Sequence, residues 1–539
     1  MAYIRTQKLT YNTDGTIRTG SASIYQNVYI KNKSYHSRPT VRERLGKVLW
    51  LADDKKSGIF QSPSRGLIGY DSGKDSFFSI DRNDPRIKHR TDLFPEAPVH
   101  TIFGDAYLLM KFLENTPLYR ALCIVFPEKE PRERLLAHLF HSVLRDGGHI
   151  SCDDLLLSSV AQYLFSDVPL NSLHSDTRYF TMLGDELAKE AFFRAFVQEM
   201  RTEHPEFGKG CYVDSTPLPN DIDVSPLNAL SCHGLSGSEI QMRLVMVLDE
   251  ETGLPVWYSI IPGNVLDINT IMHEIDDVKI TLDIDIDSLV LDAGYASKEL
   301  IHAFHIGSGK TMIAKCPARR GFHFNTLYQE VKDLIYLGKY LFVRERHTYF
   351  GYRKKKEFFG EPMYAYIYVD RRNAELRLAE KLEKDPGFME DMTDKEKDWQ
   401  TVKRGFFILL SNMEMSPAAL LDLYFRRTDI EGHFKTAKEY LKLLPLNKWS
   451  DTTVRGKILN DCISTILFSE IRKELNLEGY SPTLAFGKCR SLMCTIDGDK
   501  TVHIETPNKQ VKNIYESMKI EIPATLNIDD LKKSLSFKW

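Results

Sequence analysis

The spacing of hydrophobic and polar residues predicts a change from helices to strands near the middle of the chain. From about residue 98 to residue 200, apolar residues recur at helical intervals, as in "PRERLLAHLFHSVL". After residue 206 the apolar runs are short, and "GCYVDSTPL", "IQMRLVMVLDEETGLPVWYSIIPGN", "SLVLDAGYAS" and "TMIAKC" read as strands with helical segments among them. This β-β-β-α-β-α-β order predicts an α/β domain with a mixed sheet and covering helices.

The other regions have patterns of their own. Residues 1–52 predict a small basic β-rich module, and residues 53–95, rich in Asp, Ser, Gly and Lys, predict a linker. Residues 319–404 interrupt the alternation with a basic aromatic block and a charged helix, before "GFFILLS" resumes the sheet. The expected order is the module, the linker, a helical region over 96–205, the α/β domain in two parts over 206–318 and 405–475 with an insertion over 319–404, and a C-terminal region over 476–539.

Composition limits the class of protein. A chain of 539 residues with 42% hydrophobic content has room for about three or four domains. It has no apolar run long enough to span a membrane, and the opening "MAYIRTQKLT" lacks the apolar stretch of a secretory signal. Its eight cysteines form no CxxC pair, so we expect reduced, buried thiols and no zinc site. These features predict a cytoplasmic protein with no membrane partner.

The formal net charge of −3 hides two basic blocks. Residues 1–48 hold nine Lys/Arg against two Asp/Glu, and residues 311–356 hold eleven against three. Both blocks contain several tyrosines or phenylalanines among the cations. Such mixtures suit phosphate contacts and base stacking, although a solvated strand face with an aromatic inner side would look the same. The first module is therefore a candidate DNA-binding region, and we also expect the helical region over 96–205 to take part in DNA binding.

The segment "YFRRTDIEGHFKTAK", residues 424–438, predicts an amphipathic helix that begins near Ser416 and Pro417. Projected at 100° per residue, four side chains share a stripe about 60° wide beside the apolar face: Tyr424, Arg427, Glu431 and Lys438. One reading of this stripe is a solvated face with spaced ion pairs. A catalytic reading requires further carboxylates, because one acid alone holds a metal ion poorly.

Asp214 and Asp292 are candidates for those carboxylates, because each is expected at the end of a buried strand, where side chains project into the crevice at the sheet edge. Either aspartate alone reads as a turn residue. With Glu431 they form a set of oxygen ligands suited to Mg²⁺ or Mn²⁺, and two such ions can assist phosphoryl transfer. The other polar residues have simpler readings. Asp249 and Glu250 read as hairpin-turn residues, and Asp267 as the cap of the next helix. Asp283, Asp285 and Asp287 read as an exposed strand face or a turn, and His233 as a polar loop residue.

These motifs resemble the DDE transposases of bacterial insertion sequences, within the insertion-sequence-four superfamily. The resemblance rests on "YVDST" around Asp214, "GLPVWYSIIPGNVLD", "LDAGYAS" around Asp292, and the family's Y-(2)-R-(3)-E-(6)-K signature in the 424–438 segment. It covers residues 206–475 well and the N-terminal third more weakly. It implies an RNase H-like catalytic domain interrupted by an insertion domain, here 319–404.

The resemblance also implies a mechanism and a set of partners. Asp214, Asp292 and Glu431 would hold two Mg²⁺ or Mn²⁺ ions per active site, Arg427 and Lys438 would contact phosphates, and Tyr424 would pack against the DNA. Members of this family cut the transposon end with water and then use the freed 3′-hydroxyl to attack target DNA. The expected partners are double-stranded DNA, as terminal inverted repeats and target, and a second copy of the chain in a synaptic complex, with the C-terminal region as a candidate for dimerisation.

Members of the superfamily often open the flanking end through a DNA hairpin, with an aromatic residue of the insertion holding a flipped base. Trp399 is the candidate for that role here, and ordinary core packing is the competing reading.

Two other functions fit parts of the sequence. One is a catalytically silent, domesticated DNA-binding protein of the same fold, which the presence of all three acids disfavours. The other is a carboxylate metallohydrolase that acts on small phosphate esters, and the two basic aromatic blocks make DNA the better substrate.

Overall fold

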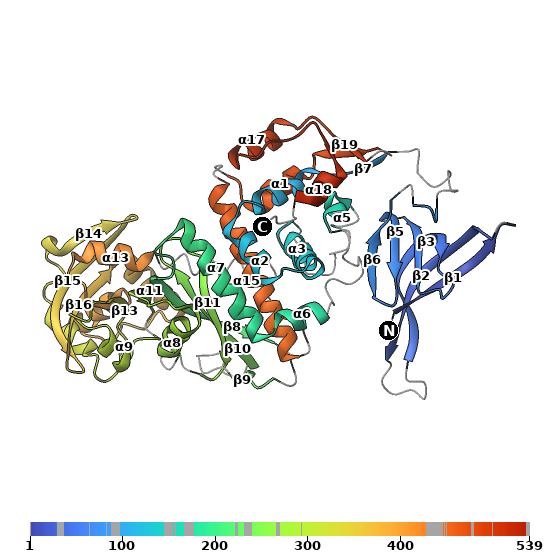
Figure 1. Ribbon diagram of the computed structural model, residues 1–539. Helices are drawn as coiled ribbons and strands as arrows, with labels where there is room; N and C mark the ends of the chain where they lie inside the picture. Colours follow the sequence, from blue (N-terminus) through green and yellow to red (C-terminus); the bar gives the residue numbers. More distant parts are fainter. Residues whose placement is uncertain are drawn as a thin grey trace. The chain divides into compact units, whose positions relative to one another are not determined.

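A computed structural model of the chain describes residues 2–13, 15–29, 37–63, 65–81, 84–87, 98–144, 155, 158–165, 177–220, 222, 225–230, 240–265, 270–292, 294–426, 446, 448, 450–475, 479–497 and 500–534. The chain divides into two compact units. Unit 1 consists of residues 1–196, 437–443 and 451–539, and unit 2 of residues 197–436 and 444–450. Figure 1 gives the elements of both units.

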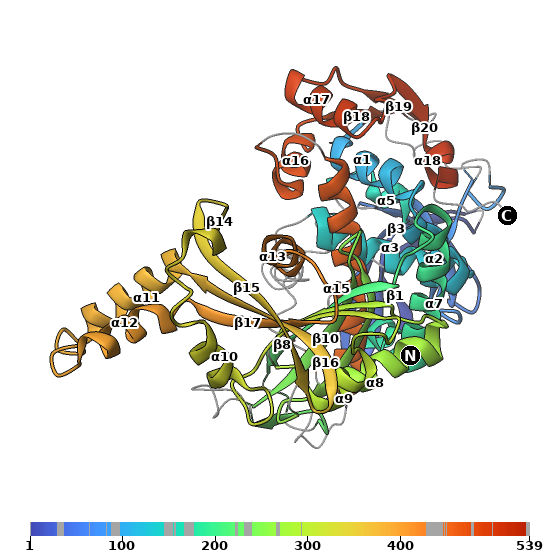
Figure 2. The ribbon, with the colours of Figure 1, turned by 90° about the vertical axis from the view of Figure 1, so that its left-hand side faces the viewer.

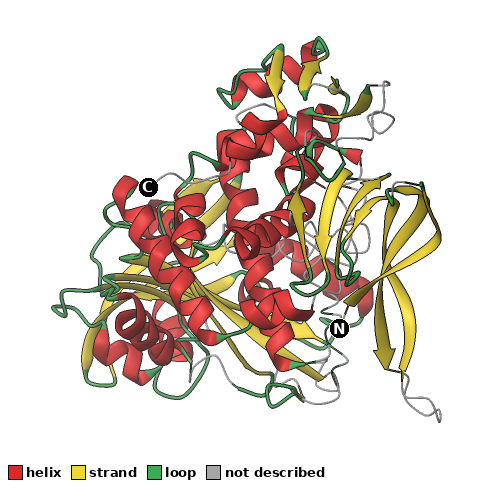
Figure 3. Cartoon of the chain, turned by 45° about the vertical axis from the view of Figure 1, so that its right-hand side comes forward, coloured by secondary structure: helices red, strands yellow, loops and turns green. Residues whose placement is uncertain are grey.

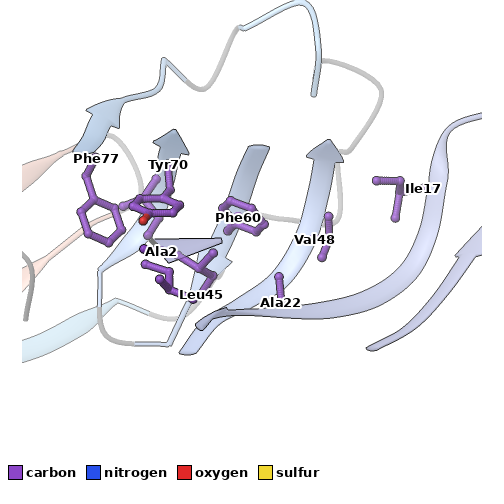
Figure 4. Close-up of a cluster of buried hydrophobic side chains, with 10 residues drawn as sticks. Ala2, Ile17, Ala22, Leu45, Val48, Phe60, Tyr70 and Phe77 are labelled. Atoms are coloured by element: carbon purple, nitrogen blue, oxygen red, sulfur yellow. The ribbon is translucent and has the colours of Figure 1, made fainter. Parts of the chain in front are cut away.

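Unit 1 begins with a six-stranded antiparallel sheet. Between residues 2 and 79, the described residues form strands, turns and connecting residues and no helix (Figure 3). Its strands, in spatial order, are β1 (Ala2–Tyr11), β2 (Ile17–Tyr29), β3 (Ser37–Leu51), β4 (Ser57–Ser62), β5 (Gly66–Asp71) and β6 (Ser76–Ser79). Alternate residues point inward, and Ala22, Leu45, Phe60 and Tyr70 belong to a buried cluster (Figure 4).

This sheet corrects the predicted boundary at residue 52. Residues 57–79, expected to belong to a linker, form β4, β5 and β6. Many of the described Gly, Ser and Asp residues that suggested a linker lie in these strands or in the tight turns between them. Gly69, for example, lies under the ring of Phe78, where an added Cβ would come within 2.2 Å of that ring.

Helices make up most of the rest of unit 1: α1 (Gly104–Leu113), α2 (Pro117–Val125), α3 (Lys129–Leu144), α5 (Ala161–Leu164), α6 (Thr177–Leu183) and α15 (Asp451–Glu474), with α7 (Glu186–Glu203) crossing the boundary between the units. The predicted helical region is confirmed. α15 was expected in the α/β domain, and the structure instead packs it against α3 and α6. Close approach explains part of this packing, since a Cβ added at Gly456 would lie 1.9 Å from the carbonyl oxygen of Phe180.

A second, four-stranded antiparallel sheet in unit 1 combines three strands of the C-terminal region with one strand at residues 99–102. Its spatial order is β20 (Thr525–Asn527), β19 (Thr501–Ile504), β18 (Met493–Ile496) and β7 (Val99–Ile102). Three helices accompany these strands: α16 (Pro482–Cys489), α17 (Lys509–Ser517) and α18 (Ile528–Ser534). The C-terminal strands therefore pair with residues of their own chain.

Unit 2 contains one large mixed sheet, with every strand of the predicted α/β pattern present. Its spatial order is β11 (Pro255–Pro262), β10 (Ile240–Asp249), β8 (Gly210–Pro219), β12 (Ser288–Leu291), β13 (Thr311–Lys315), β17 (Phe406–Ser411), β16 (Glu361–Asp370), β15 (His347–Phe358) and β14 (Leu341–Arg344), with β9 (Ala229–Leu230) beside β10. β8, β12 and β13 are parallel to one another, and the other pairs are antiparallel. Helices α8 (Ile271–Leu282) and α9 (Lys298–Ala303) lie in the connections on either side of β12.

The predicted insertion extends this sheet and adds helices beyond it. It contains α10 (Phe324–Val331), η5 (Gly338–Tyr340), strands β14 to β16, and the helices α11 (Arg371–Lys384) and α12 (Asp394–Lys403). Figure 2 shows α11 and α12 side by side, extending away from the sheet. Asp370 caps α11, and Thr393 and Glu396 form a capping box at α12, so local sequence sets both helix starts.

Two expectations from composition can be compared with the structure. In the part of the chain that is described, no helix is both long enough and apolar enough to cross a membrane. Six of the eight cysteines lie in that part, and all six are buried and free: Cys123, Cys211, Cys316, Cys462, Cys489 and Cys494. Cys152 and Cys232 lie outside the described residues.

Candidate active site

The candidate site lies where three parallel strands are neighbours. β12 pairs with β8 on one side and with β13 on the other, and Leu291 lies beside both Val213 and Ala314. The next residues of the three strands, Asp214, Asp292 and Lys315, therefore align in the same order. Side chains in register share one face of a sheet, and adjacent strands are about 4.8 Å apart, so the two carboxylates can reach one ligand.

The structure refines the predicted position of Asp214. β8 continues to Pro219, so Asp214 lies within its strand and not at the strand end. Beyond this point β8 remains paired with β10, where Asp214 faces Met246, but its pairing with β12 ends at Val213. Asp292 follows the last residue of β12, as predicted. The two acids thus lie where β8 and β12 separate.

Each aspartate has a different local environment. One oxygen of Asp214 accepts a hydrogen bond from the backbone N–H of Ser215, at 2.8 Å. The hydroxyl of Ser215 contacts the guanidinium of Arg243, a buried residue of β10. Asp292 accepts a hydrogen bond from the Tyr424 hydroxyl at 3.3 Å. The Asp292 carboxylate therefore keeps further lone pairs for a ligand.

Lys315 is a functional candidate that the sequence analysis missed. Its Nζ atom is 3.9 Å from Oδ1 of Asp292, and the two side chains are 42% and 40% exposed. It follows the apolar run "TMIA", just as Asp292 follows "SLVL". A charged residue directly after an apolar strand is the signal in the sequence that points to both Asp292 and Lys315.

Helix α13 (Pro417–Phe425) covers the sheet face that carries the acids (Figure 2). Lys315 pairs with Leu409, and Leu409 pairs with Tyr366, so these three residues lie on the same face of the sheet. The Tyr366 hydroxyl donates a hydrogen bond to the carbonyl of Met413 at 2.7 Å, and the Tyr368 hydroxyl donates to that of Pro417 at 2.7 Å. Burial raises the pKa of both tyrosines, so they remain donors at neutral pH.

The start and the end of α13 are both fixed to strands of the insertion. Gly351 permits close approach at the start, because an added Cβ would lie 2.8 Å from the Cβ of Pro417. Near the end, Arg344 of β14 pairs with Asp422 at 2.8 Å and stacks over the ring of Phe425, 4.5 Å from its centroid. These contacts position Tyr424 over Asp292.

The structure brings together some of the predicted residues and does not describe others. The Tyr424 hydroxyl lies beside Asp292, Asp214 follows Val213 in the neighbouring strand β8, and the predicted helix start at Ser416 and Pro417 is confirmed. Arg427, Glu431 and Lys438, like Asp267 and His233, lie outside the described residues. Among the residues that are described, no cluster of three or more His, Cys, Asp or Glu side chains is placed to hold a metal ion.

Several of the other acids have the structural roles expected of them. Asp249 accepts the backbone N–H of Thr252 at 2.7 Å in the turn between β10 and β11. Asp283 is the C-cap of α8, with a φ of 55°. Asp285 pairs with Lys279 at 2.8 Å on the surface.

Trp399 lies in an aromatic cluster of the insertion. Its ring is 3.9 Å from that of Tyr328 on α10 and 6.4 Å from that of Phe406 on β17, measured between centroids. These contacts fasten α12 to the sheet, which fits the packing interpretation of this residue. The base-holding role remains a prediction.

A groove lies beside the start of α13. It has a volume of about 560 Å³ and combines cations with aromatic rings. Its lining is Lys339, Tyr340, Leu341, Phe342, Gly351, Tyr352, Arg353 and Met415 to Ala418. The second basic block therefore contributes to a concave surface next to the helix that carries Tyr424.

Comparison with known proteins finds a family model that matches this region. Residues 210–464 match the family model described as "Transposase DDE domain", a span that includes both aspartates and the whole 424–438 segment. None of the curated proteins compared with the chain matches it in sequence. Among solved structures, the chain is similar to a piggyBac transposase in a synaptic complex with hairpin DNA, at 10% identity and a TM-score of 0.38, over 72% of this chain and 79% of that one. The likeness rests on the family match, because residues 210–464 match the model of the transposase DDE domain.

Proposed function

We propose that this chain is a transposase that cuts the ends of its own insertion sequence and joins them to target DNA by a cut-and-paste route. The observation that supports this most is the register of β8 and β12, in which Val213 pairs with Leu291, the residues directly before Asp214 and Asp292. The remaining acid of the proposed site is Glu431, which follows α13 by a few residues.

The topology supports an RNase H-like catalytic core. β8, β10 and β11 form an antiparallel meander, and β12 and β13 continue from β8 in parallel. Numbered along the chain, these five strands have the spatial order 3-2-1-4-5. In this proposal residues 319–404 are the insertion domain between the second aspartate and the glutamate.

The donor set suits Mg²⁺ or Mn²⁺. Carboxylate oxygens are the ligands these ions prefer, and two aspartates this close repel each other unless a cation lies between them. Asp214, Asp292 and Glu431 would hold the ions, two per site. When bound, such ions activate water or a 3′-hydroxyl and stabilise the leaving oxygen of a phosphodiester.

The residues around the acids would handle the substrate. Tyr424 orients Asp292 through its hydroxyl, and Lys315 supplies a half-exposed cation beside the same carboxylate. In this proposal Arg427 and Lys438 contact phosphates near the cut, and Arg427 can do so with two hydrogen bonds. These cations offset the charge of the DNA that must approach three acids.

The proposal includes further steps that follow from the family resemblance. Two copies of the chain would hold two transposon ends in the cytoplasm of a bacterial cell, and a hairpin step would place a flipped base against Trp399. That indole already packs against Tyr328, so the hairpin role competes with a structural one.

Cleavage of labelled DNA tests the proposal. Duplexes that cover the DNA on each side of the gene are incubated with the protein and Mg²⁺, and we expect nicks at the element's ends. Asp214→Asn and Glu431→Gln should remove cleavage, and Asp285→Asn, which alters an exposed aspartate paired with Lys279, should not. Cleavage that persists in the Asp214 and Glu431 variants would contradict the site, and binding without any cleavage by the unmodified protein would favour the silent DNA-binding alternative.

A further inference from the structure

The outward side of the N-terminal sheet presents three rows of side chains across β1, β2 and β3, which we call the outer face. Register fixes these rows: Tyr3, Tyr25 and Val41; Arg5, Ser23 and Arg44; Gln7, Ser21 and Lys47. Residues between them along the strands, such as Ile4, Ala22 and Ile24, point into the opposite side and form the core. Two irregularities in the pairing of β2 with β3 keep these rows aligned.

The outer face is positively charged and contains no acid. Arg5, Arg44 and Lys47 are its ionisable cations, and all three are exposed. Two acids of the same sheet are engaged elsewhere. Glu43 is buried and pairs with Arg65 at 3.2 Å, and Asp75 pairs with Arg42 at 2.7 Å.

The first row adds aromatic and apolar surface to these cations. The rings of Tyr3 and Tyr25 stack with 6.0 Å between centroids, and the guanidinium of Arg5 lies 5.2 Å from the Tyr25 centroid. Tyr3 and Val41 are still 38% and 47% exposed. Exposed rings and a valine do not make a surface more soluble, whereas a binding surface can pack them against the sugars and bases of a nucleic acid.

From these observations we propose that the outer face of β1–β3 binds double-stranded DNA, chiefly through its phosphates. Three strands span about 10 Å from the first axis to the third, so Arg5 and Arg44 can contact phosphates on either side of a groove about 12 Å wide. Ser21, Ser23 and Gln7 supply hydrogen-bond donors between the cations. The choice of DNA as the partner rests on the proposed function. The inference assigns DNA binding to residues of β1–β3, which are far in sequence from Asp214, Asp292 and Glu431.

The test compares two variants of the full chain that lose the same charge. The face variant carries Arg5→Gln, Arg44→Gln and Lys47→Gln, and the control carries Lys55→Gln, Lys56→Gln and Lys74→Gln, which alter exposed lysines in the turns of the same sheet. Binding to a labelled duplex of about 30 base pairs, roughly three helical turns, is measured between about 50 and 200 mM NaCl. Circular dichroism checks that both variants are folded.

We expect the face variant to bind at least tenfold more weakly, with the slope of log K against log salt reduced by about 2.7, because each phosphate contact contributes about 0.9. The control should stay within about threefold of the unmodified protein, because lysines outside the contact act only through the screened long-range field. Equal losses in the two variants, or no loss in either, would overturn the inference. Tighter binding of the unmodified protein to an RNA duplex than to DNA would overturn the choice of partner.

The outcome is separable from that of the proposed function. The Asp292→Asn variant should bind the duplex as the unmodified protein does and fail to cut it. If no protein cuts DNA but the face variant still loses binding, the proposed function fails and this inference stands.

Discussion

Two lysine–aspartate pairs of nearly equal length, one from each unit, lie in very different settings. In unit 2, Lys315 and Asp292 are 3.9 Å apart and about 40% exposed. In unit 1, Lys457 and Asp461 of α15 are 4.0 Å apart and at most 3% exposed. The distance is the same to within 0.1 Å, so burial and surroundings must separate the roles of the two pairs.

The buried pair belongs to a network that links three helices. The Asp461 carboxylate accepts a hydrogen bond from the Asn460 side chain at 2.9 Å, and Asn460 accepts one from the Tyr179 hydroxyl at 2.8 Å. The Tyr179 ring stacks on His138 with 4.1 Å between centroids. Burial lowers the pKa of Lys457, the sign of a charge held at a cost. The buried pair contacts other side chains inside the protein, whereas Asp292 and Lys315 are exposed enough to contact a ligand.

The largest expected effect is on activity and comes from the half-exposed pair. Asp292→Asn should reduce DNA cleavage on the order of 10³-fold or more, because in the proposed function it removes a charged metal ligand. Its melting temperature should be unchanged or slightly higher, because removing one of two adjacent acids relieves repulsion. Mg²⁺ should raise the melting temperature of the unmodified protein and not that of the variant. If the variant unfolds instead, the Asp292–Lys315 pair has a structural role like that of the Asp461–Lys457 pair.

The buried pair should show the opposite behaviour. Asp461→Asn leaves the Lys457 charge without its buried counter-ion, and we expect a loss of about 3 kcal/mol in the stability of the surrounding helices. Hydrogen exchange of residues 451–474 reports this loss locally, which suits a chain of two units. The double variant Lys457→Met, Asp461→Asn should recover most of the stability, because no buried charge remains. Failure of the double variant to recover would show that packing, and not charge, explains the loss.

The stability of the Asp461→Asn variant should depend on pH in a definite direction. An unfolded lysine titrates near pH 10.4, and burial lowers the pKa of Lys457 in the folded chain. Between these two values the unfolded state binds more protons, so stability should rise as the pH rises towards about 10.4. The double variant, which lacks this lysine, is the control, and equal pH dependence in both would contradict the assignment to Lys457.

A smaller effect is expected from the hydrogen bond that joins α13 to the acids. Tyr424→Phe removes the donor to Asp292 and keeps the ring, so cleavage should fall by roughly fivefold, about 1 kcal/mol, with little change in melting temperature. Tyr364→Phe is the matched control, because its hydroxyl bonds to Glu414 at 2.8 Å elsewhere on the same sheet. Equal losses from the two substitutions would indicate a general effect on the sheet.

The smallest expected effect comes from Trp399, where packing and reaction compete for one side chain. Trp399→Phe keeps an aromatic ring against Tyr328, so cleavage should stay within about twofold if the residue acts by packing. Measuring hairpin products on denaturing gels separates the two roles. A tenfold loss of hairpin product in a folded variant would assign Trp399 to the flipped base.

Strand pattern and local signals predicted much of unit 2. The runs ending at Asp214 and Asp292, the start of α13 at Ser416 and the turn at Asp249 all depend on interactions between residues close in sequence, which periodicity and capping report directly. The boundary at residue 52 was wrong because glycine and serine mark both linkers and tight β turns. The place of α15 was also wrong, since its partners α3 and α6 are distant in sequence.

Periodicity and turn chemistry were thus enough to predict the α/β class and the basic character of the first block, and they selected Asp214 and Asp292 as candidates. The pairing of strands supplied what they left open: that the residues before the two aspartates are neighbours, that Lys315 lies near Asp292, and that Arg5, Arg44 and Lys47 share one face of a sheet. The physical reason is that a side chain's face and its neighbours across a sheet depend on register, which is fixed by contacts between residues far apart along the chain.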